Sequence, residues 1–375
     1  MRYRIMPGSR EKLSVLGFGC MRFHTDAEGK IIEDEAMEML RHAYDKGINY
    51  FDTAWPYHNG ESEPLLGRFL QTIDRSKVYV ATKLPSWLIQ KPEDMMDYLN
   101  QQLQKLQTDY IDYYLVHALN VKFWSNLKQQ KLFDYLDEAK AKGLIRKVGF
   151  SFHDSYSLFR KIVDAYPWDF CQIMLNYLDT SYQAGLKGMK YAASKGLGIV
   201  IMEPLRGGKL VDKIPDEVTD IWKKSPMLLS PVERSLHWIW HHKVVQVILR
   251  GMSSLAQIKE NIAIAGKSKA GYLPESELRR YMRARKAYLK RIKIHCSFCR
   301  YCLPCPSNLP IPFIFEMYND AFMFDDKARL LHEYKLFLGE ETRADKCTKC
   351  GACLQKCPRQ IDIPSRMQEI AEFFQ

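Results

Sequence analysis

The stretch INYFDT, residues 48–53, is a short run rich in β-branched and aromatic residues, which is typical of a buried strand. It follows EDEAMEMLRHAYDKG, residues 33–47, in which apolar residues recur at steps of three and four. That spacing predicts an amphipathic helix that stops at Gly47. A helix that leads directly into a strand is the building unit of an α/β protein.

The same alternation continues through the first 270 residues, where PEDMMDYLNQQLQKL (92–106) again has helical spacing. The other β-rich runs are Leu13–Gly19, Val78–Lys83, Ile111–His117, Arg146–Ser151, Phe170–Tyr177, Gly198–Pro204 and Val244–Gly251. Eight strand–helix units over roughly 250 residues are the count and length of a TIM (β/α)8 barrel. An open doubly wound sheet is the alternative, but no G-x-G-x-x-G follows the first strand.

Polar side chains collect where the predicted strands end. Asp52, Lys83, His117 and Ser151 stand at the ends of the second to fifth strands, and Tyr57 follows Asp52 by five residues. In a TIM barrel these ends meet at one mouth. Each residue alone has a structural explanation, as a helix cap, a surface charge or a core histidine. Their joint placement indicates a site.

The chemistry of this set is that of proton transfer to a carbonyl oxygen. A phenol titrates near pH 10, and a buried lysine beside it would stabilise the phenolate and lower its pKa. Asp52 would hold Lys83 in place, and a neutral His117 could orient a carbonyl oxygen. Tyr57 would then donate a proton to that oxygen as hydride arrives at the carbon.

Three motifs resemble the aldo-keto reductase family: FDTAWPYHNGESEPLLGRFL (51–70), ATK (81–83) and LVHALN (115–120). The resemblance spans roughly residues 1–265. It implies a TIM barrel that moves hydride between a nicotinamide cofactor, NADP or NAD, and a small carbonyl or alcohol substrate. It also implies that Tyr57 is the general acid/base and that Asp52, Lys83 and His117 support it.

The same resemblance implies where the nicotinamide cofactor binds. VGFSFHD (148–154) stands where the family holds the nicotinamide amide. GMSSLAQIKEN (251–261) is a strand-to-helix turn able to receive phosphate at a helix N-terminus, and the family grips the adenosine end there. Arg250 is the only cation at hand, so NADP and NAD both stay open. The residues expected to contact the cofactor are Ser151, Gln172, Asn176, Arg250, Gly251, Ser253, Gln257 and Asn261.

Eight of the ten cysteines lie after residue 295, in CSFCRYCLPCP (296–306) and CTKCGACLQKCP (347–358). From each final cysteine onward, CPSNLPIP (305–312) matches CPRQIDIP (357–364) without a gap, which indicates an internal duplication. The second run has the C-x2-C-x2-C-x3-C-P spacing of bacterial ferredoxins. Zinc held by separate C-x2-C pairs is the alternative, although the duplicated pattern favours iron–sulfur.

The tail therefore resembles a two-cluster ferredoxin-type module, and the whole chain resembles the iron–sulfur branch of aldo-keto reductases. This implies a barrel over residues 1–270 and a small, mainly α-helical ferredoxin-like domain over residues 271–375. It also implies two [4Fe–4S] clusters with crossed ligands. The expected sets are Cys296, Cys299, Cys302 and Cys357 for one cluster, and Cys347, Cys350, Cys353 and Cys305 for the other.

The composition limits the class of protein, since 46% apolar and 26% charged residues argue against disorder. Part of the net charge of +11 lies at Arg279, Arg280, Arg283, Arg285, Lys286, Lys290, Arg291 and Lys293. This segment is either a solvated helix face or a docking face for an acidic electron carrier such as a ferredoxin. No basic pattern interleaved with aromatics indicates nucleic acid. Without an apolar run of bilayer length or a signal-peptide stretch, we expect a cytoplasmic protein that does not bind membranes.

Three functional hypotheses remain at this stage. In the first, an oxidoreductase exchanges electrons between its clusters and a docked carrier. In the second, a plain carbonyl reductase carries structural clusters. In the third, the chain is a redox sensor that binds nicotinamide without fast catalysis, although a pure sensor would not need Tyr57.

Overall fold

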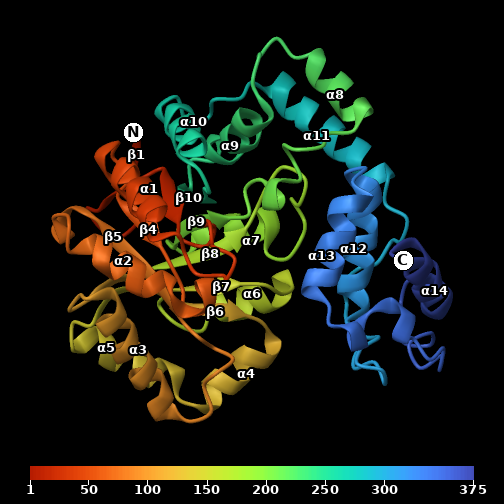
Figure 1. Ribbon diagram of the computed structural model, residues 1–375, viewed down its shortest axis with the longest axis horizontal. Coiled ribbons are helices and arrows are strands. Elements are labelled where there is room, and N and C mark those ends of the chain that lie inside the picture. The colour runs from red at the N-terminus through yellow and green to blue at the C-terminus, as the bar shows by residue number, and fades with distance from the viewer. The chain divides into compact units, whose positions relative to one another are not determined.

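The computed structural model describes residues 1–375, which divide into two compact units (Figure 1). The barrel unit comprises Met1–Gly207 and Leu229–Pro274. The cysteine unit comprises Gly208–Leu228 and Glu275–Gln375. No helix is both long and apolar enough to cross a membrane.

The barrel unit is a closed barrel of eight parallel strands, with the order β10-β3-β4-β5-β6-β7-β8-β9. The strands are β3 (Leu16–Gly19), β4 (Tyr50–Asp52), β5 (Tyr79–Leu84), β6 (Ile111–Leu119), β7 (Ile145–Phe152), β8 (Phe170–Met174), β9 (Gly198–Met202) and β10 (Val245–Gly251). Each predicted β-rich run supplies one of them, so the predicted TIM barrel is confirmed and the open sheet is excluded.

Helices surround the strands in the barrel unit (Figure 1). They are α1 (Glu33–Asp45), α2 (Ser62–Leu70), α3 (Pro92–Leu106), α4 (Val121–Gln129), α5 (Leu132–Ala141), α6 (Tyr156–Val163), α7 (Gly185–Ser194), α9 (Pro231–His241) and α10 (Leu255–Gly266). The apolar positions of α1 are the buried ones, including Met39 and Leu40. Gly47 follows α1 with a φ of 88°, a left-handed conformation that glycine adopts without strain.

The predicted first strand, Leu13–Gly19, is divided in the structure. Its start belongs to β2 (Lys12–Ser14), which pairs antiparallel with β1 (Tyr3–Ile5), and only its end enters the barrel as β3. At the break, the carbonyl of Val15 accepts two hydrogen bonds, one of 3.0 Å from the Trp240 indole and one of 2.9 Å from the backbone N–H of Ile248 on β10.

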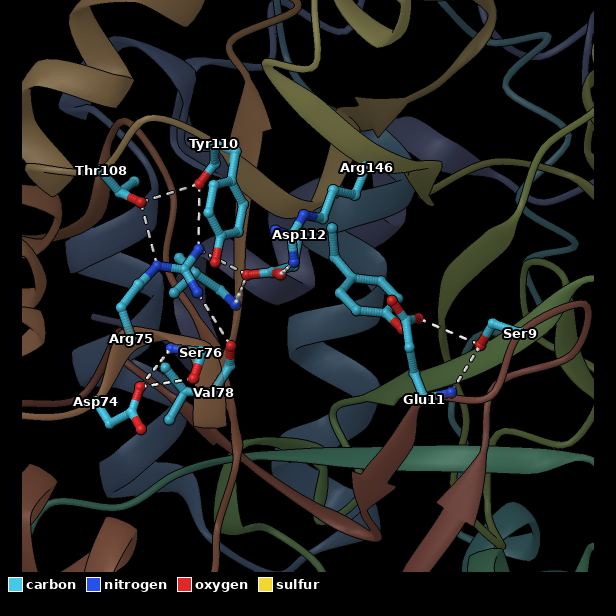
Figure 2. Close-up of polar contacts among 12 residues, drawn as sticks. Ser9, Glu11, Asp74, Arg75, Ser76, Val78, Thr108, Tyr110, Asp112 and Arg146 are labelled. Atoms are coloured by element: carbon cyan, nitrogen blue, oxygen red, sulfur yellow. Dashed lines mark hydrogen bonds and ion pairs between the residues drawn. The ribbon is translucent and has the colours of Figure 1, made fainter.

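An ionic cluster joins β5, β6 and β7 where these strands begin (Figure 2). Buried Asp112 pairs with Arg75 at 2.7 Å and with Arg146 at 3.2 Å, and it accepts the backbone N–H of Val80 at 3.0 Å. The two guanidinium groups also lie over the Tyr110 ring, 4.4 and 3.5 Å from its centroid. These contacts are at the end of the barrel opposite to the predicted mouth, where a stabilising role is expected.

The cysteine unit is mainly helical, as predicted. Its helices are α8 (Asp216–Lys223), α11 (Glu275–Lys290), α12 (Ile311–Met323), α13 (Lys327–Phe337) and α14 (Ile363–Phe373). Side chains from α12, α13 and α14 form one apolar core, and most of the tail cysteines pack against it. The equivalent Ile-Pro segments of the two repeats begin α12 and α14, so the duplicated sequence has a duplicated structure.

Residues 208–228 pack with the cysteine unit, whereas a single division at residue 270 would leave them in the barrel. Ion pairs explain the difference. The Lys209 amine lies 3.1 Å from Asp320 on α12 and 2.8 Å from Glu333 on α13. All three side chains are largely buried, and water screens such pairs less than exposed ones.

Candidate functional site

Four candidate residues come together where the barrel strands end. Asp52 ends β4, Lys83 lies near the end of β5, His117 lies on β6, and Tyr57 begins a 3-10 turn, Tyr57–Gly60. The fully buried Lys83 amine donates to Asp52 Oδ1 and to the Thr53 carbonyl, both at 2.7 Å. The same amine lies 5.0 Å from the Tyr57 ring centroid. The His117 ring lies 6.3 Å from the Tyr57 ring.

Burial and charge set the protonation states of this group. Burial lowers the pKa of Lys83, but the neighbouring Asp52 and Tyr57 outweigh it, so the pKa is raised and the amine stays charged. For Tyr57, burial raises the pKa of the phenol and the Lys83 charge only partly offsets that effect. The predicted lowering influence of Lys83 is present, but burial exceeds it, so the net pKa of the phenol is raised and not lowered. At neutral pH Tyr57 is a protonated hydroxyl with a cation beside it.

His117 is held as a neutral imidazole. Burial, followed by the charge of Lys83 and by His153, lowers the pKa of His117 well below its usual value. Its Nδ1 atom is buried without a hydrogen-bond partner. The Trp87 ring lies 5.2 Å from the imidazole and is 39% exposed, so it forms a wall between this site and solvent.

The residues expected around a nicotinamide ring lie at neighbouring strand ends. Ser151, which is buried at the end of β7, accepts the backbone N–H of Ala118 at 2.7 Å. Gln172 on β8 is 3% exposed, and its Oε1 atom has no partner. Asn176 has both amide atoms engaged, because Nδ2 donates to Asp179 and Oδ1 accepts two backbone N–H groups. Of these three residues, Gln172 is therefore the one whose side-chain oxygen is still able to accept a hydrogen bond.

The last strand-to-helix turn carries the remaining cofactor candidates: Arg250, Gly251, Ser253, Gln257 and Asn261. Gln257 accepts from the Ser253 N–H at 3.1 Å, which shapes the turn before α10. Asn261 on α10 is fully buried, and neither amide atom has a partner.

Arg22 is a neighbour of this turn that the sequence did not indicate. A Cβ on Gly251 would lie 2.5 Å from Arg22 Cγ, so the arginine stem lies directly against this glycine. It follows the end of β3, which pairs with β10 in the closed barrel, and only barrel closure brings it to the turn. The turn therefore has the stem of a second arginine against it, in addition to Arg250.

The tail cysteines form two groups of four around two cavities. One cavity is lined by Cys296, Cys299, Cys302 and Cys357, and the other by Cys347, Cys350, Cys353 and Cys305. No three or more His, Cys, Asp or Glu side chains are placed for a single metal ion. Each group surrounds a cavity instead of one point, which suits a cluster better than the zinc alternative, in which thiolates converge at about 2.3 Å.

The backbone around both cavities has alternating left-handed residues. Phe298 and Arg300 have φ of 56° and 63°, and the equivalent Lys349 and Gly351 have 55° and 74°. Successive N–H groups in such loops point to one side and form nests that bind anions, including iron–sulfur clusters.

The basic segment before the first cysteine run is partly neutralised. Arg280 pairs with Glu277 at 3.1 Å, and Arg291 pairs with Glu217 at 2.7 Å. Arg279 pairs with Glu275 within α11. Besides Arg279, four cations of the segment are exposed: Arg283, Lys286, Lys290 and Lys293.

Comparison with known proteins matches two families. Residues 15–270 match the aldo/keto reductase family, and residues 295–361 match the 4Fe-4S dicluster domain. L-galactose dehydrogenase of Arabidopsis thaliana is 29% identical over 278 residues, which cover 67% of this chain and 84% of that protein. An uncharacterised oxidoreductase of Bacillus subtilis is 25% identical over 312 residues, which cover 74% of this chain and 95% of that protein. The holo form of an aldo-keto reductase from Bacillus halodurans has a TM-score of 0.64 at 23% identity, covering 76% and 96%.

Proposed function

Because the chain belongs to the aldo/keto reductase family, we propose that it is a nicotinamide-dependent oxidoreductase that interconverts a small carbonyl compound and its alcohol. The observation that carries the proposal is the buried ion pair of Lys83 and Asp52, 2.7 Å long, next to Tyr57. A buried cation, a protonated phenol and a neutral imidazole side by side are the groups that general acid/base catalysis needs to transfer one proton to or from a carbonyl oxygen.

The chain's own residues fit a nicotinamide dinucleotide. Gln172 Oε1 and both amide atoms of Asn261 are buried and unpartnered, and a buried polar group left unsatisfied costs about 1–3 kcal/mol. A carboxamide at one end of the cofactor and a nucleobase at the other offer the missing partners. Arg250 and Arg22 beside the β10–α10 turn would attract the phosphates. When bound, the nicotinamide supplies or accepts a hydride.

Each residue of the mouth has a part in the proton transfer. The Tyr57 hydroxyl donates its proton to the substrate oxygen, and the Lys83 amine stabilises the phenolate left behind. Asp52 keeps that amine charged and fixed, while neutral His117 hydrogen-bonds the same oxygen and orients it. In alcohol oxidation, the direction that the name of the Arabidopsis relative suggests, Tyr57 takes the proton back.

The first test is the variant Tyr57→Phe, which keeps the ring and removes the proton. We expect kcat for carbonyl reduction to fall by about 10²–10⁴-fold, the usual contribution of general acid catalysis. Tyr44→Phe is the matched control, since Tyr44 packs edge-on against Phe69 on the outer helices. An unchanged kcat for Tyr57→Phe would contradict the proposal and revive the sensor hypothesis.

We also propose that the cysteine unit holds two [4Fe–4S] clusters, one in each cavity, with the crossed ligand sets. The four cysteines and the left-handed loops around each cavity support this. Iron and acid-labile sulfide equivalent to two clusters per chain are expected after anaerobic purification. Zinc in their place would contradict the proposal.

Electron exchange with an acidic carrier is the finer part of the proposal, and the four exposed cations near α11 support it by charge. We expect the visible cluster absorption of the anaerobic protein to bleach when a reduced ferredoxin or viologen is added. Bleaching by NADPH or NADH would in addition connect the clusters with the barrel chemistry. Bleaching by neither carrier nor nucleotide would favour structural clusters.

A further inference from the structure

The two cysteine cavities are lined by equivalent positions of the two repeats of the internal duplication. Ser297 of the first cavity corresponds to Thr348 of the second, and Phe315 corresponds to Met367. Ile361 of the first cavity corresponds to Leu309 of the second. Each follows the cysteine that its cavity receives from the other run, Cys357 in the first and Cys305 in the second. The two linings therefore match position by position, except that Pro306 lines the second cavity and its equivalent Pro358 does not line the first.

Two equivalent positions break this symmetry, and both differ in charge. Arg300 lines the first cavity where Gly351 lines the second, and Arg359 lines the first where Ser307 lines the second. Arg300 and Gly351 share a left-handed backbone, so the backbone geometry is the same and only the side chain differs. No charged side chain lines the second cavity.

Other nearby charges reduce this difference only in part. The Arg359 guanidinium donates to the His295 carbonyl at 3.3 Å, which anchors it next to Cys296. Glu316 acts on Cys296 with the opposite sign and offsets part of the positive charge. Lys349 is near the second cavity but does not line it, because its amine donates to Gln368 at 2.7 Å.

Positive charge beside an iron–sulfur cluster stabilises its reduced form, which carries one more negative charge than the oxidised form. Net charge near the cluster is one of the factors that set its reduction potential. We propose that Arg300 and Arg359 make the two clusters unequal, so that the cluster in the first cavity has the higher potential and is reduced first. This rests on the proposed cluster content of the cysteine unit.

Unequal potentials give electron flow within the cysteine unit a direction. One electron leaves a reduced cluster in the second cavity, which is thereby oxidised, and reduces the cluster in the first cavity. No proton or bond is exchanged in this step. Both arginines are exposed, so water and salt screen their effect, and the difference in potential should shrink as ionic strength rises.

The experiment is a dithionite titration of the anaerobic full-length protein, followed by electron paramagnetic resonance, with variants that exchange the two positions. The wild type should show two one-electron midpoints. Arg359→Ser should lower only the upper midpoint, by up to about 59 mV, which is a tenfold change in a one-electron equilibrium. Ser307→Arg should raise only the lower midpoint. Lys349→Gln removes a nearby charge that lines neither cavity and should move both midpoints less.

Coincident midpoints in the wild type would overturn the inference. A downward shift of the lower midpoint in Arg359→Ser would overturn it as well, because it would assign the arginine to the other cluster. Arg300→Gly provides a second, independent variant whose backbone is already suited to glycine. A protein that holds no iron would instead defeat the proposed clusters, and iron analysis before each titration separates that failure from the others.

Discussion

The barrel mouth is assembled from three strands, whereas each cysteine cavity is assembled from two short loops of one repeated pattern. At the mouth, Lys83 is fully buried and already paired with Asp52 at 2.7 Å. In the cavities, Cys299 and Cys350 are exposed and none of the eight thiols has a disulfide partner. The protein's own ion pair therefore holds the mouth in shape, while the cavities depend on what they bind. The following predictions test that difference.

The largest expected effect is that of removing iron from the cysteine unit. The free energy of binding a structural metal is also folding free energy, about 10 kcal/mol or more in small metal-bound domains. Treatment with a chelator under reducing conditions should abolish hydrogen-exchange protection in α12 and α14, which carry the core behind the cysteines. Protection in β4–β6 should persist. Equal loss of hydrogen-exchange protection in both units would contradict the difference between the mouth and the cavities.

A smaller effect is expected from Lys83→Met at the mouth. Removing one partner of a buried ion pair leaves an uncompensated charge on Asp52 and costs about 3–5 kcal/mol. Chemical denaturation of the barrel unit should show this loss, and the iron content should stay at the wild-type value. Lys77→Met is the control, since it removes a lysine from an exposed pair with Asp74. Similar losses in the two variants would show that burial does not strengthen the mouth.

Asp112→Asn tests the opposite end of the barrel, with an expected loss of about 2 kcal/mol from hydrogen bonds to charged groups. The variant weakens the contacts to Arg75 and Arg146 that join three strands (Figure 2). Stability should fall in denaturant, while kcat and the cluster spectrum stay unchanged. A selective loss of kcat would show that the ionic cluster positions the mouth as well.

The sequence predicted the eight strands and the mouth because both follow local rules. Strand runs such as Val78–Lys83 are apolar and short, and the position of a residue at a strand end fixes where it lies in a closed barrel. The first three cysteines of each run are equally local, since their spacing groups residues that are close in the chain. The strands, the mouth and these triplets need no knowledge of long-range packing, whereas the crossed places of Cys305 and Cys357 followed from the resemblance to two-cluster ferredoxins.

Long-range packing decided what the sequence could not predict. Residues 208–228 join the cysteine unit through Lys209 and its partners more than a hundred positions away, and no local pattern marks them. Arg22 reaches Gly251 only because β3 and β10 close the barrel. The direction of the Tyr57 pKa shift depends on how deeply the phenol is buried, which the residue types alone do not reveal.

Counted for one histidine and one pH unit, the smallest predicted effect is a pH dependence located in the barrel unit. Burial lowers the pKa of His242 to about 4, and it also lowers the pKa values of His117 and His153. Unfolded histidines titrate near pH 6.5. Below that pH the unfolded chain therefore binds protons that these buried histidines of the native barrel do not bind. The free energy of unfolding should therefore fall as pH drops from about 6.5 toward 4, by at most about 1.4 kcal/mol per pH unit for each histidine. Asp52, whose pKa burial raises, acts in the opposite direction and offsets part of the slope.

Hydrogen exchange of barrel amides, corrected for the intrinsic rate, measures this slope between about pH 7 and about pH 5 in the cluster-bound protein. His242→Gln should reduce the slope, because the variant removes a group that titrates only when the barrel unfolds. If the cysteine unit loses protection with the same slope and responds to His242→Gln, the two units unfold together and acid acts on the whole chain. A slope confined to the barrel would mean that the buried histidines destabilise the mouth in acid while the cysteine unit stays folded around its clusters.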